Sequence, residues 1–361
     1  MTTATRLANL RRRLAEESLD ALVVSDAVNR RYLSGFTGSA GHLIVGADAA
    51  LFAVDSRYYE QVSQQAPDFT LEKVGYDFVA NLARILGEAS ARRVGFEART
   101  LTVADFDGWR KATPDVEWLP TYGLVEELRA IKEPGELATI AAAVRLTDEC
   151  FAYVADIAKP GMTEKQLGWE IEKYFRERDA QNWVAGPIVA SGPNSALPHA
   201  RPSARPLGLG EPITVDMGCL VDGYHSDLTR TFVLGHADAK FEEIYNLVLK
   251  AHQTCEDGVR AGMVTKAIDA LARDVIEAAG YGEAFGHSLG HGVGLAIHEA
   301  PWARRIGEDT VADGMTLTVE PGVYLPGWGG VRIEDTIVIR EHGAEVLTRS
   351  PKRLQDMVIH V

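Results

Sequence analysis

Residues 214–232 read TVDMGCLVDGYHSDLTRTF, and this stretch predicts a β-hairpin that organises the second part of the chain. The pair Asp222-Gly223 forms the turn, because it readily adopts the positive φ angles of a two-residue type I′ loop. That turn places Val221 opposite Tyr224, and it fixes the register of every residue pair further along the two strands.

The hairpin brings two aspartates to one face. Asp227 lies opposite Gly218, and Asp216 shares the face of Gly218 because side chains alternate along a strand. Asp216 and Asp227 are therefore diagonal neighbours. Two carboxylates on a buried face resist ionisation unless a cation balances them. They could instead be solvated strand residues, but the flanking runs TVDM and LTRTFVL are too apolar for a solvated sheet. We therefore interpret the pair as metal ligands.

The composition is typical of a soluble globular protein of more than one domain. The chain has 361 residues, of which 46% are hydrophobic and 24% charged, and this length predicts two domains. The net charge of −14 argues against a nucleic-acid-binding surface. Three scattered cysteines without a CxxC pair indicate reduced thiols in a cytoplasmic protein. No stretch of about twenty apolar residues occurs, so no membrane span is expected.

Helices and strands alternate over residues 1–130, which predicts a small α/β domain with a parallel or mixed sheet. Helices are expected at 5–18, 56–65, 78–88 and 103–111 and strands at 21–25, 51–55 and 93–97, with NRRYLSGFTGSAG as a loop. Pro134 suits the first turn of a long helix that runs to about residue 158. The domain boundary is therefore placed near residue 130, and residues 131–361 form the second domain.

The second domain contains an internal repeat. Gly161-Met162 joins one pair of long helices, Gly262-Met263 joins another, and β-rich sequence follows each pair. We interpret these as two halves, each of two helices plus sheet, related by a pseudo-two-fold axis. Chance similarity of two helix-connecting turns is the alternative. A duplicated half-domain would place a site on the sheet between the halves.

Three further segments carry metal-type side chains. His287, His291 and His298 occur within FGHSLGHGVGLAIH, whose glycines argue against a helix. Gly290 and Gly292 remove side-chain bulk around His291, which suits a residue pressed against an ion or a substrate.

The other two segments supply acids. Glu320 ends the apolar strand MTLTVE and stands before Pro-Gly at a sheet rim. In GVRIEDTIVI, taken as one strand, Arg332 and Glu334 share a face and Asp335 points to the other side. The resulting candidate ligand set has four carboxylates and one imidazole: Asp216, Asp227, His291, Glu320 and Glu334. Such a set can hold two divalent ions bridged by water, and it suits Mn(II), Co(II) or Zn(II).

The order of these residues, in the contexts VDMG, HSDLTRTF, GHGVG, VEPGVY and RIEDT, resembles the pita-bread metallopeptidases. Within them it is similar to the Xaa-Pro peptidases, prolidase and aminopeptidase P. The stretches SGFTGSAG and DSRYYEQ resemble that family's N-terminal domain. The resemblance implies an α+β fold, with a pita-bread catalytic domain of two helix-pair-plus-antiparallel-sheet halves at 131–361. It also implies a smaller, creatinase-like α/β domain at 1–130 that serves substrate access and dimerisation.

The resemblance also implies roles for the metal ligands. Asp216 would bind one ion only, Asp227 and Glu334 would bridge two ions, and His291 would bind the other ion. Glu320 would be a ligand and the general base that passes a proton from water to the leaving nitrogen. Manganese is the metal expected, two ions per subunit, with cobalt or zinc as alternatives.

Four more residues resemble contacts to substrate. His199 would steady the tetrahedral intermediate, and His298 would contact the peptide near the scissile bond. His287 and Arg332 would support the ligands or contact the substrate carboxylate. His199 could instead be a structural loop histidine, and His298 a sheet-edge residue paired with Glu299.

The expected activity is hydrolysis of Xaa-Pro bonds by a metal-bridging water or hydroxide, with a dipeptidase favoured over an aminopeptidase P that acts on longer peptides. Alternatives are a metal-free creatinase-type enzyme, a methionine aminopeptidase, and a non-enzymatic binding module of the same fold. The expected partners are proline-containing di- or oligopeptides and a second subunit of a homodimer, without nucleic acid or membrane.

Overall fold

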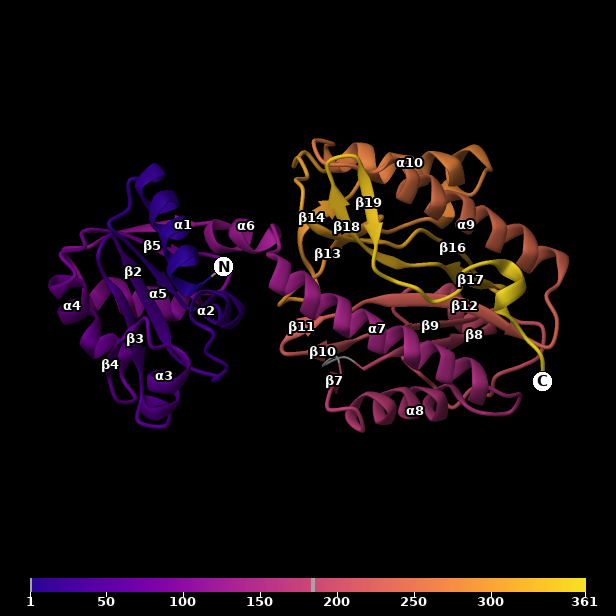
Figure 1. Ribbon diagram of the computed structural model, residues 1–361, viewed down its shortest axis with the longest axis horizontal. Coiled ribbons are helices and arrows are strands. Elements are labelled where there is room, and N and C mark those ends of the chain that lie inside the picture. The colour runs from indigo at the N-terminus through magenta and orange to yellow at the C-terminus, as the bar shows by residue number, and fades with distance from the viewer. Residues whose placement is uncertain (1, 183–185) are drawn as a thin grey trace. The chain divides into compact units, whose positions relative to one another are not determined.

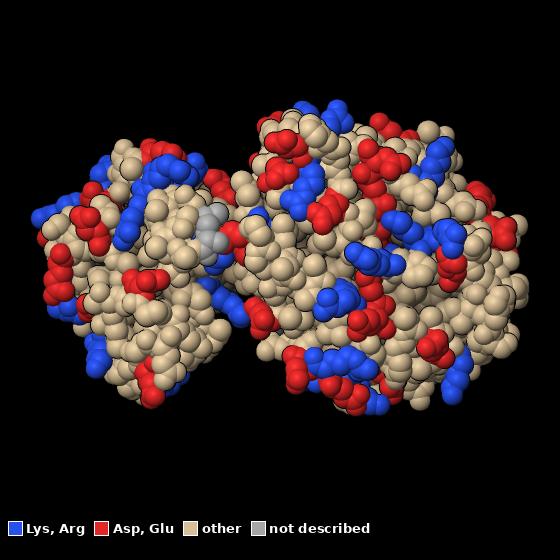
Figure 2. Space-filling view, in the orientation of Figure 1, with Lys and Arg blue, Asp and Glu red and all other residues tan. Residues whose placement is uncertain are grey.

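The computed structural model describes residues 2–182 and 186–361. The chain divides into two compact units, Met1–Arg129 and Ala130–Val361. Within the described residues, no helix combines the length and the hydropathy that a membrane span requires. Acidic and basic side chains are interspersed on the face shown in Figure 2.

The first unit is a six-stranded mixed sheet with helices around it. The strand order is β4-β3-β2-β1-β5-β6, with β1 parallel to β5 and antiparallel to β2. The strands are β1 (Ala21–Val24), β2 (His42–Gly46), β3 (Ala50–Val54), β4 (Thr70–Lys73), β5 (Arg93–Glu97) and β6 (Glu117–Thr121). The helices are α1 (Thr3–Glu16), α2 (Ala27–Ser34), α3 (Tyr59–Gln65), α4 (Phe78–Glu88), α5 (Val103–Ala112) and α6 (Leu124–Ala130).

One loop prediction in this unit is wrong. Residues 27–34 form helix α2, because the Asp26 side chain accepts hydrogen bonds from Val28 N and Asn29 N and so caps the helix. The glycine-rich remainder of that stretch, from Gly35 onward, is without helix or strand up to β2.

The second unit places two helix pairs on either side of layered antiparallel strands (Figure 1). The helices are α7 (Pro134–Ile157), α8 (Glu164–Arg176), α9 (Ala239–Gly258) and α10 (Thr265–Ala278). The strands are β7 (Gln181–Asn182), β8 (Ile188–Ser191), β9 (Ile213–Met217), β10 (Cys219–Val221), β11 (Tyr224–His225), β12 (Leu228–Leu234), β13 (Gly290–Gly292), β14 (Glu299–Ala303), β15 (Thr316–Val319), β16 (Gly322–Leu325), β17 (Gly329–Arg332), β18 (Asp335–Arg340), β19 (Gly343–Val346) and β20 (Val358–Ile359). Short 3₁₀ turns are η1 (Gly192–Ala196), η2 (Gly282–Ala284) and η3 (Leu354–Met357).

The internal repeat is visible as matched hydrogen bonds. Gly161 N donates to Leu207 O at 3.0 Å, and Gly262 N donates to Val311 O at 2.8 Å. Both glycines have positive φ, 84° and 86°, which glycine adopts without strain. Isolated bridges follow in each half at equivalent places, Thr163 with Pro206 and Val264 with Thr310. The two helix connections are therefore one structure used twice.

The hairpin has the predicted turn and register. Asp222 and Gly223 have φ angles of 47° and 78°, and Val221 pairs with Tyr224 while Thr229 pairs with Asp216. The hairpin is not continuous, however. It is interrupted between β9 and β10 and between β11 and β12, and the inner pair joins β7 whereas the outer pair joins β8 and β20.

The single strand predicted over 330–339 is also interrupted. Strand β17 ends at Arg332 and pairs with β16, whereas β18 begins at Asp335 and pairs with β15. Ile333 and Glu334 cross from one sheet to the other. Arg332 and Asp335 nevertheless point to opposite sides, toward Asp216 and Arg230 respectively.

Phe232 tests the hairpin's contribution to stability. Its side chain is fully buried in the core of the second unit and contacts the ring of Phe151. We expect Phe232→Ala to lower the free energy of unfolding of this unit by about 3–5 kcal/mol, because it leaves a cavity. Denaturant unfolding followed by circular dichroism measures this. Ile306→Ala, at a side chain that is 80% exposed, is the control and should change little; equal effects would contradict the assignment.

Candidate metal centre

Three of the predicted ligands meet in the interior of the second unit. Asp227, His291 and Glu334 are buried and each offers one ligand atom within 4.8 Å of the others. They come from the interrupted hairpin, from β13 and from the crossover between β17 and β18. The structure thus brings together residues that are far apart in the sequence.

Asp216 and Glu320 complete the group at its more open side. Their side chains are 14% and 16% exposed. His291 Nε2 lies 3.4 Å from Glu320 Oε1 and 3.6 Å from Asp227 Oδ2. After burial, neighbouring carboxylates that include Asp216 raise the pKa of Asp227 and Glu334. All five predicted ligands therefore belong to one cluster that retains partial access to solvent.

The glycines around His291 permit close backbone packing. A Cβ added at Gly290 would lie 1.8 Å from Thr318 O, and one at Gly292 would lie 2.1 Å from Ala300 O. These positions therefore exclude any larger residue. Glycine is required here because neighbouring backbone atoms leave no room for a side chain. His291 is held where its ring faces the carboxylates.

The tautomer of His291 leaves a lone pair for a ligand. Its Nδ1 lies 3.1 Å from Gly292 O, a carbonyl that can only accept, so Nδ1 carries the proton. Burial, and next the charge of His298, lower the pKa of His291 to about 4. A neutral ring then directs an unprotonated Nε2 toward carboxylate oxygens. That contact is unfavourable unless a proton or a cation lies between them.

The carboxylates resist ionisation as a group. Burial raises the pKa of Glu320 to about 8, and the charge of Asp216 adds to the effect. Burial also raises the pKa values of Asp227 and Glu334 well above their usual range, and neighbouring carboxylates raise them further. The group is therefore neutralised either by protons or, if cations bind, by divalent ions.

Two oxygens of the cluster lack a protein partner. Asp216 Oδ1 and Glu334 Oε1 are buried and accept no hydrogen bond from the described residues. The other oxygen of each is bound, Asp216 Oδ2 by Arg332 and Glu334 Oε2 by Thr229. A buried acceptor without a donor is costly. An oxygen-rich set with one imidazole nitrogen fits Mn(II), Co(II) or Zn(II).

Arg332 is buried rather than open to substrate. It is 3% exposed and donates to four acceptors: Asp216 Oδ2, Tyr324 Oη, Thr229 Oγ1 and Pro198 O. This geometry does not support the predicted direct contact with a substrate carboxylate. It instead makes Arg332 the partner that holds Asp216.

His287 is tied to the same arginine through Tyr324. His287 Nδ1 donates to Ser288 O at 2.8 Å, and its Nε2 lies 3.0 Å from Tyr324 Oη. Burial lowers the pKa of His287 to about 3, so the neutral ring accepts from Tyr324. A chain of hydrogen bonds from Arg332 through Tyr324 to His287 agrees with the predicted support of the ligands, and the substrate contact of His287 stays a prediction.

His199 and His298 are both exposed. The ring of His298 lies 4.3 Å from that of His291. His199 follows η1 in a turn. Burial raises the pKa of Asp216, and the charge of Arg332, then that of His199, opposes this effect, so His199 lies near the cluster. Of the predicted residues, these two remain available to a ligand beside the cluster.

Sequence reasoning missed Trp302. It pairs across the strands with His291, and its ring stacks at 6.4 Å on His298. Cross-strand partners share a face, so Trp302 forms an aromatic wall beside the cluster. Trp302 could have been found only from the pairing of β13 with β14. That pairing contains a bulge, which no sequence pattern predicts.

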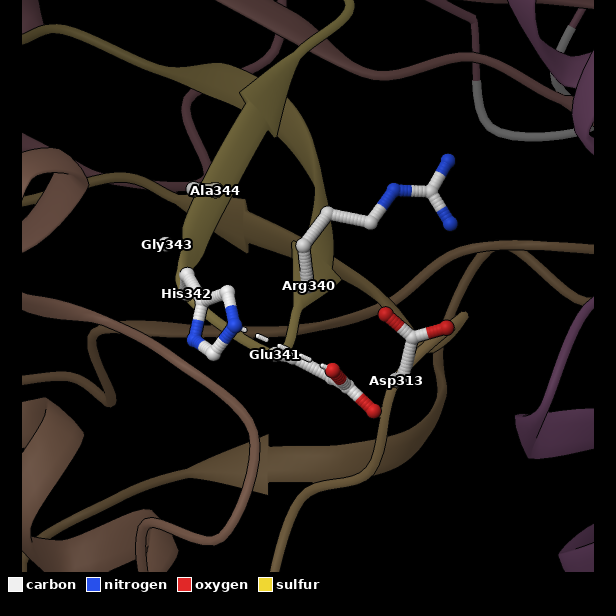
Figure 3. Close-up of a pocket in the computed structure, with 6 residues that line it drawn as sticks. All are labelled: Asp313, Arg340, Glu341, His342, Gly343 and Ala344. Atoms are coloured by element: carbon white, nitrogen blue, oxygen red, sulfur yellow. Dashed lines mark ion pairs between the residues drawn. The ribbon is translucent and has the colours of Figure 1, made fainter.

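A surface pocket elsewhere in this unit carries no comparable arrangement (Figure 3). It has a volume of about 450 Å³ and is lined by Asp313, Arg340, Glu341, His342, Gly343 and Ala344. Its His342–Glu341 pair spans 3.9 Å between side chains that are 95% and 77% exposed. It shares no residue with the metal cluster.

Proton release tests the cluster as a cation site. In the metal-free folded protein the pKa of Glu320 is about 8, whereas its ordinary value is 4.5. Protonation of Glu320 therefore contributes fully to stability below the unfolded pKa, and this contribution is lost as pH rises through the folded pKa. Cations require ionised ligands, so the increase in Tm caused by Mn²⁺ should grow from about pH 6 to 8.5.

Thermal unfolding of EDTA-treated and Mn²⁺-loaded protein measures this difference. The variant Asp227→Asn should show little increase in Tm at any pH. A metal-induced increase that is independent of pH in the wild type would contradict the protonation of the cluster.

Two family models match the chain: metallopeptidase family M24 over residues 138–341 and the creatinase/prolidase N-terminal domain over residues 6–131. The structure of Xaa-Pro dipeptidase from Bacillus anthracis is 38% identical and has a TM-score of 0.95, covering 100% of both chains. X-Pro aminopeptidase from Thermotoga maritima is 32% identical, with a TM-score of 0.87, and covers 95% of this chain and 98% of that chain.

The Xaa-Pro dipeptidase of Pyrococcus furiosus is 33% identical over 350 residues, which is 97% of this chain and 99% of that protein. The predicted fold is confirmed: a creatinase-like N-terminal domain precedes a pita-bread domain. The chain is a metallopeptidase and belongs to family M24.

Proposed function

We propose that this metallopeptidase hydrolyses Xaa-Pro peptide bonds with two divalent metal ions held by Asp216, Asp227, His291, Glu320 and Glu334. The observation that carries the proposal is the convergence of these five side chains, two of which have buried oxygens that accept no hydrogen bond from the described residues. Similar proteins named Xaa-Pro dipeptidase and X-Pro aminopeptidase support the substrate class.

The ligands divide by position. We assign Asp227 and Glu334, which are the most buried carboxylates of the set, as bridges between two ions. Asp216 would hold one ion, and His291 the other. Bound divalent ions lower the pKa of water and polarise the peptide carbonyl. Manganese is our first expectation, with cobalt and zinc as alternatives.

Glu320 is assigned the proton transfers. Its carboxylate is partly exposed at the open side of the cluster, and Thr318 Oγ1 donates to its Oε1 at 3.2 Å. It takes a proton from the attacking water and returns it to the leaving nitrogen. The proline nitrogen has no N–H and must be protonated to leave, so this second transfer is obligatory.

The exposed side of the cluster is assigned to the substrate. His298 and His199 supply donors for the developing oxyanion and the peptide. Trp302 offers an apolar surface for the pyrrolidine ring, because its indole lies on the same side of the strand pair as His291. Arg332 acts on this side through Asp216, which it holds in place.

Two further proposals concern the surroundings of the site. We expect a homodimer in which the N-terminal domain of one subunit limits access to the site of the other. Cys150, Cys219 and Cys255 are buried free thiols, which supports a reducing compartment such as the cytoplasm.

The general-base assignment is tested by Glu320→Gln, which keeps the shape of the side chain and removes its basicity. We expect kcat on an Xaa-Pro dipeptide to fall by at least about 10²–10⁴-fold in the Mn²⁺-loaded protein. Glu341→Gln, at the exposed pocket of Figure 3, is the control and should retain activity. Near-normal turnover by Glu320→Gln would exclude this role.

Substrate length is tested with metal-loaded wild-type protein and a series Xaa-Pro, Xaa-Pro-Xaa and longer peptides. We expect the highest kcat/KM for the dipeptide, because the proposed enzyme is a dipeptidase. Equal or higher kcat/KM on the longer peptides would establish aminopeptidase P activity instead. No cleavage of any prolyl bond would favour a non-enzymatic pita-bread protein.

A further inference from the structure

Glu334 owes its position to two consecutive residues of β12. Its backbone N donates to Thr229 O at 3.0 Å, and its carbonyl accepts from Arg230 Nη1 at 2.5 Å. Its Oε2 accepts from Thr229 Oγ1 at 2.6 Å. Both backbone groups and one carboxylate oxygen are therefore bound to Thr229 and Arg230, whereas Oε1 has no hydrogen-bond partner in the described part of the chain.

These hydrogen bonds matter because Glu334 lies outside any strand. The crossover of residues 333–334 receives no ladder hydrogen bonds from β16 or β15, whose pairing ends at Arg332 and begins at Asp335. A ligand on such a crossover needs other contacts to keep its carboxylate in one orientation. The contacts from β12 supply them.

Arg230 is built for this task. Its side chain is fully buried, and its five N–H groups have one acceptor each. These acceptors are Pro351 O (2.9 Å), Thr229 O (3.0 Å), Glu334 O (2.5 Å), Asp335 Oδ1 (2.7 Å) and Ser350 O (2.8 Å). The arginine thus joins β12, the crossover and the C-terminal segment.

Its charge is balanced on the side of the sheet away from the cluster. Asp335 pairs with Arg230 and also with Lys352, which in turn binds Glu256. Arg230 therefore reaches the metal side only through backbone carbonyls. Its contribution to the metal centre is one of geometry, through Glu334, rather than of direct charge pairing with a ligand.

We propose that Thr229 and Arg230 are positioning residues for the metal centre, which orient Glu334 so that its Oε1 faces the metal ions. The proposal rests on the proposed function of the cluster. A lysine at 230 would keep the charge but lose the planar fork that reaches five acceptors. A valine at 229 would keep the shape and lose the bond to Glu334 Oε2 together with the acceptor for Arg332 Nε.

The test is metal binding itself. Mn²⁺ affinity is measured by isothermal titration calorimetry, and Co²⁺ loading by visible absorption, on apo protein of each variant. We expect Arg230→Lys to weaken Mn²⁺ affinity by about 10–100-fold and to alter the Co²⁺ spectrum. Arg30→Lys is the matched control: Arg30 is also buried and binds backbone carbonyls, but in the first unit. It should bind Mn²⁺ as the wild type does.

A pair at position 229 keeps the test valid if Arg230→Lys does not fold. Thr229→Val should weaken Mn²⁺ affinity, whereas Thr229→Ser, which retains the hydroxyl, should restore it. Wild-type affinity and Co²⁺ spectra in both Arg230→Lys and Thr229→Val would overturn the proposal, even if their unfolding temperatures fall. A wild type that binds no divalent ion would instead refute the proposed function.

Discussion

The main constraint on the second domain is the electrostatic repulsion among four carboxylates that the fold holds close together. Burial disfavours the charged form of each, and neighbouring carboxylates disfavour ionisation of Asp227, Glu320 and Glu334 further, whereas Arg332 opposes this effect. An imidazole whose unprotonated nitrogen faces the same oxygens adds to the strain. Such a cluster is favourable only when protons or cations neutralise it. We therefore expect these buried side chains to bind cations more tightly than the same residues would if they were exposed to solvent.

The five candidate ligands come from both halves of the domain. The first half supplies Asp216 and Asp227 through one hairpin, and the second supplies His291, Glu320 and Glu334. The duplicated helix connections show how the halves are related. A site between two such halves requires both to be folded, so the metal would also stabilise the whole domain.

Much of this could be predicted from the sequence, because short-range signals fix it. The Asp222-Gly223 turn determined the register that places Asp216 beside Asp227. The start of the long helix Pro134–Ile157 followed from Pro134, which lies in its first turn as predicted. The family-like contexts of the five ligands identified a set that the structure does bring together.

What could not be predicted depends on long-range contacts. The crossover at Glu334 exists because β17 and β18 join different sheets, and the run GVRIEDTIVI alone reads as one strand. The partners of Arg332 likewise come from distant segments, so its burial was not apparent. Trp302 lies beside the cluster only through a bulged strand pair.

The most direct measurement of the central claim is anomalous diffraction from crystals grown with Mn²⁺, recorded on both sides of the manganese absorption edge. The account predicts two anomalous peaks, each contacted by carboxylates of Asp227 and Glu334, with His291 on one and Asp216 on the other. Peaks elsewhere, or none among these side chains, would contradict it.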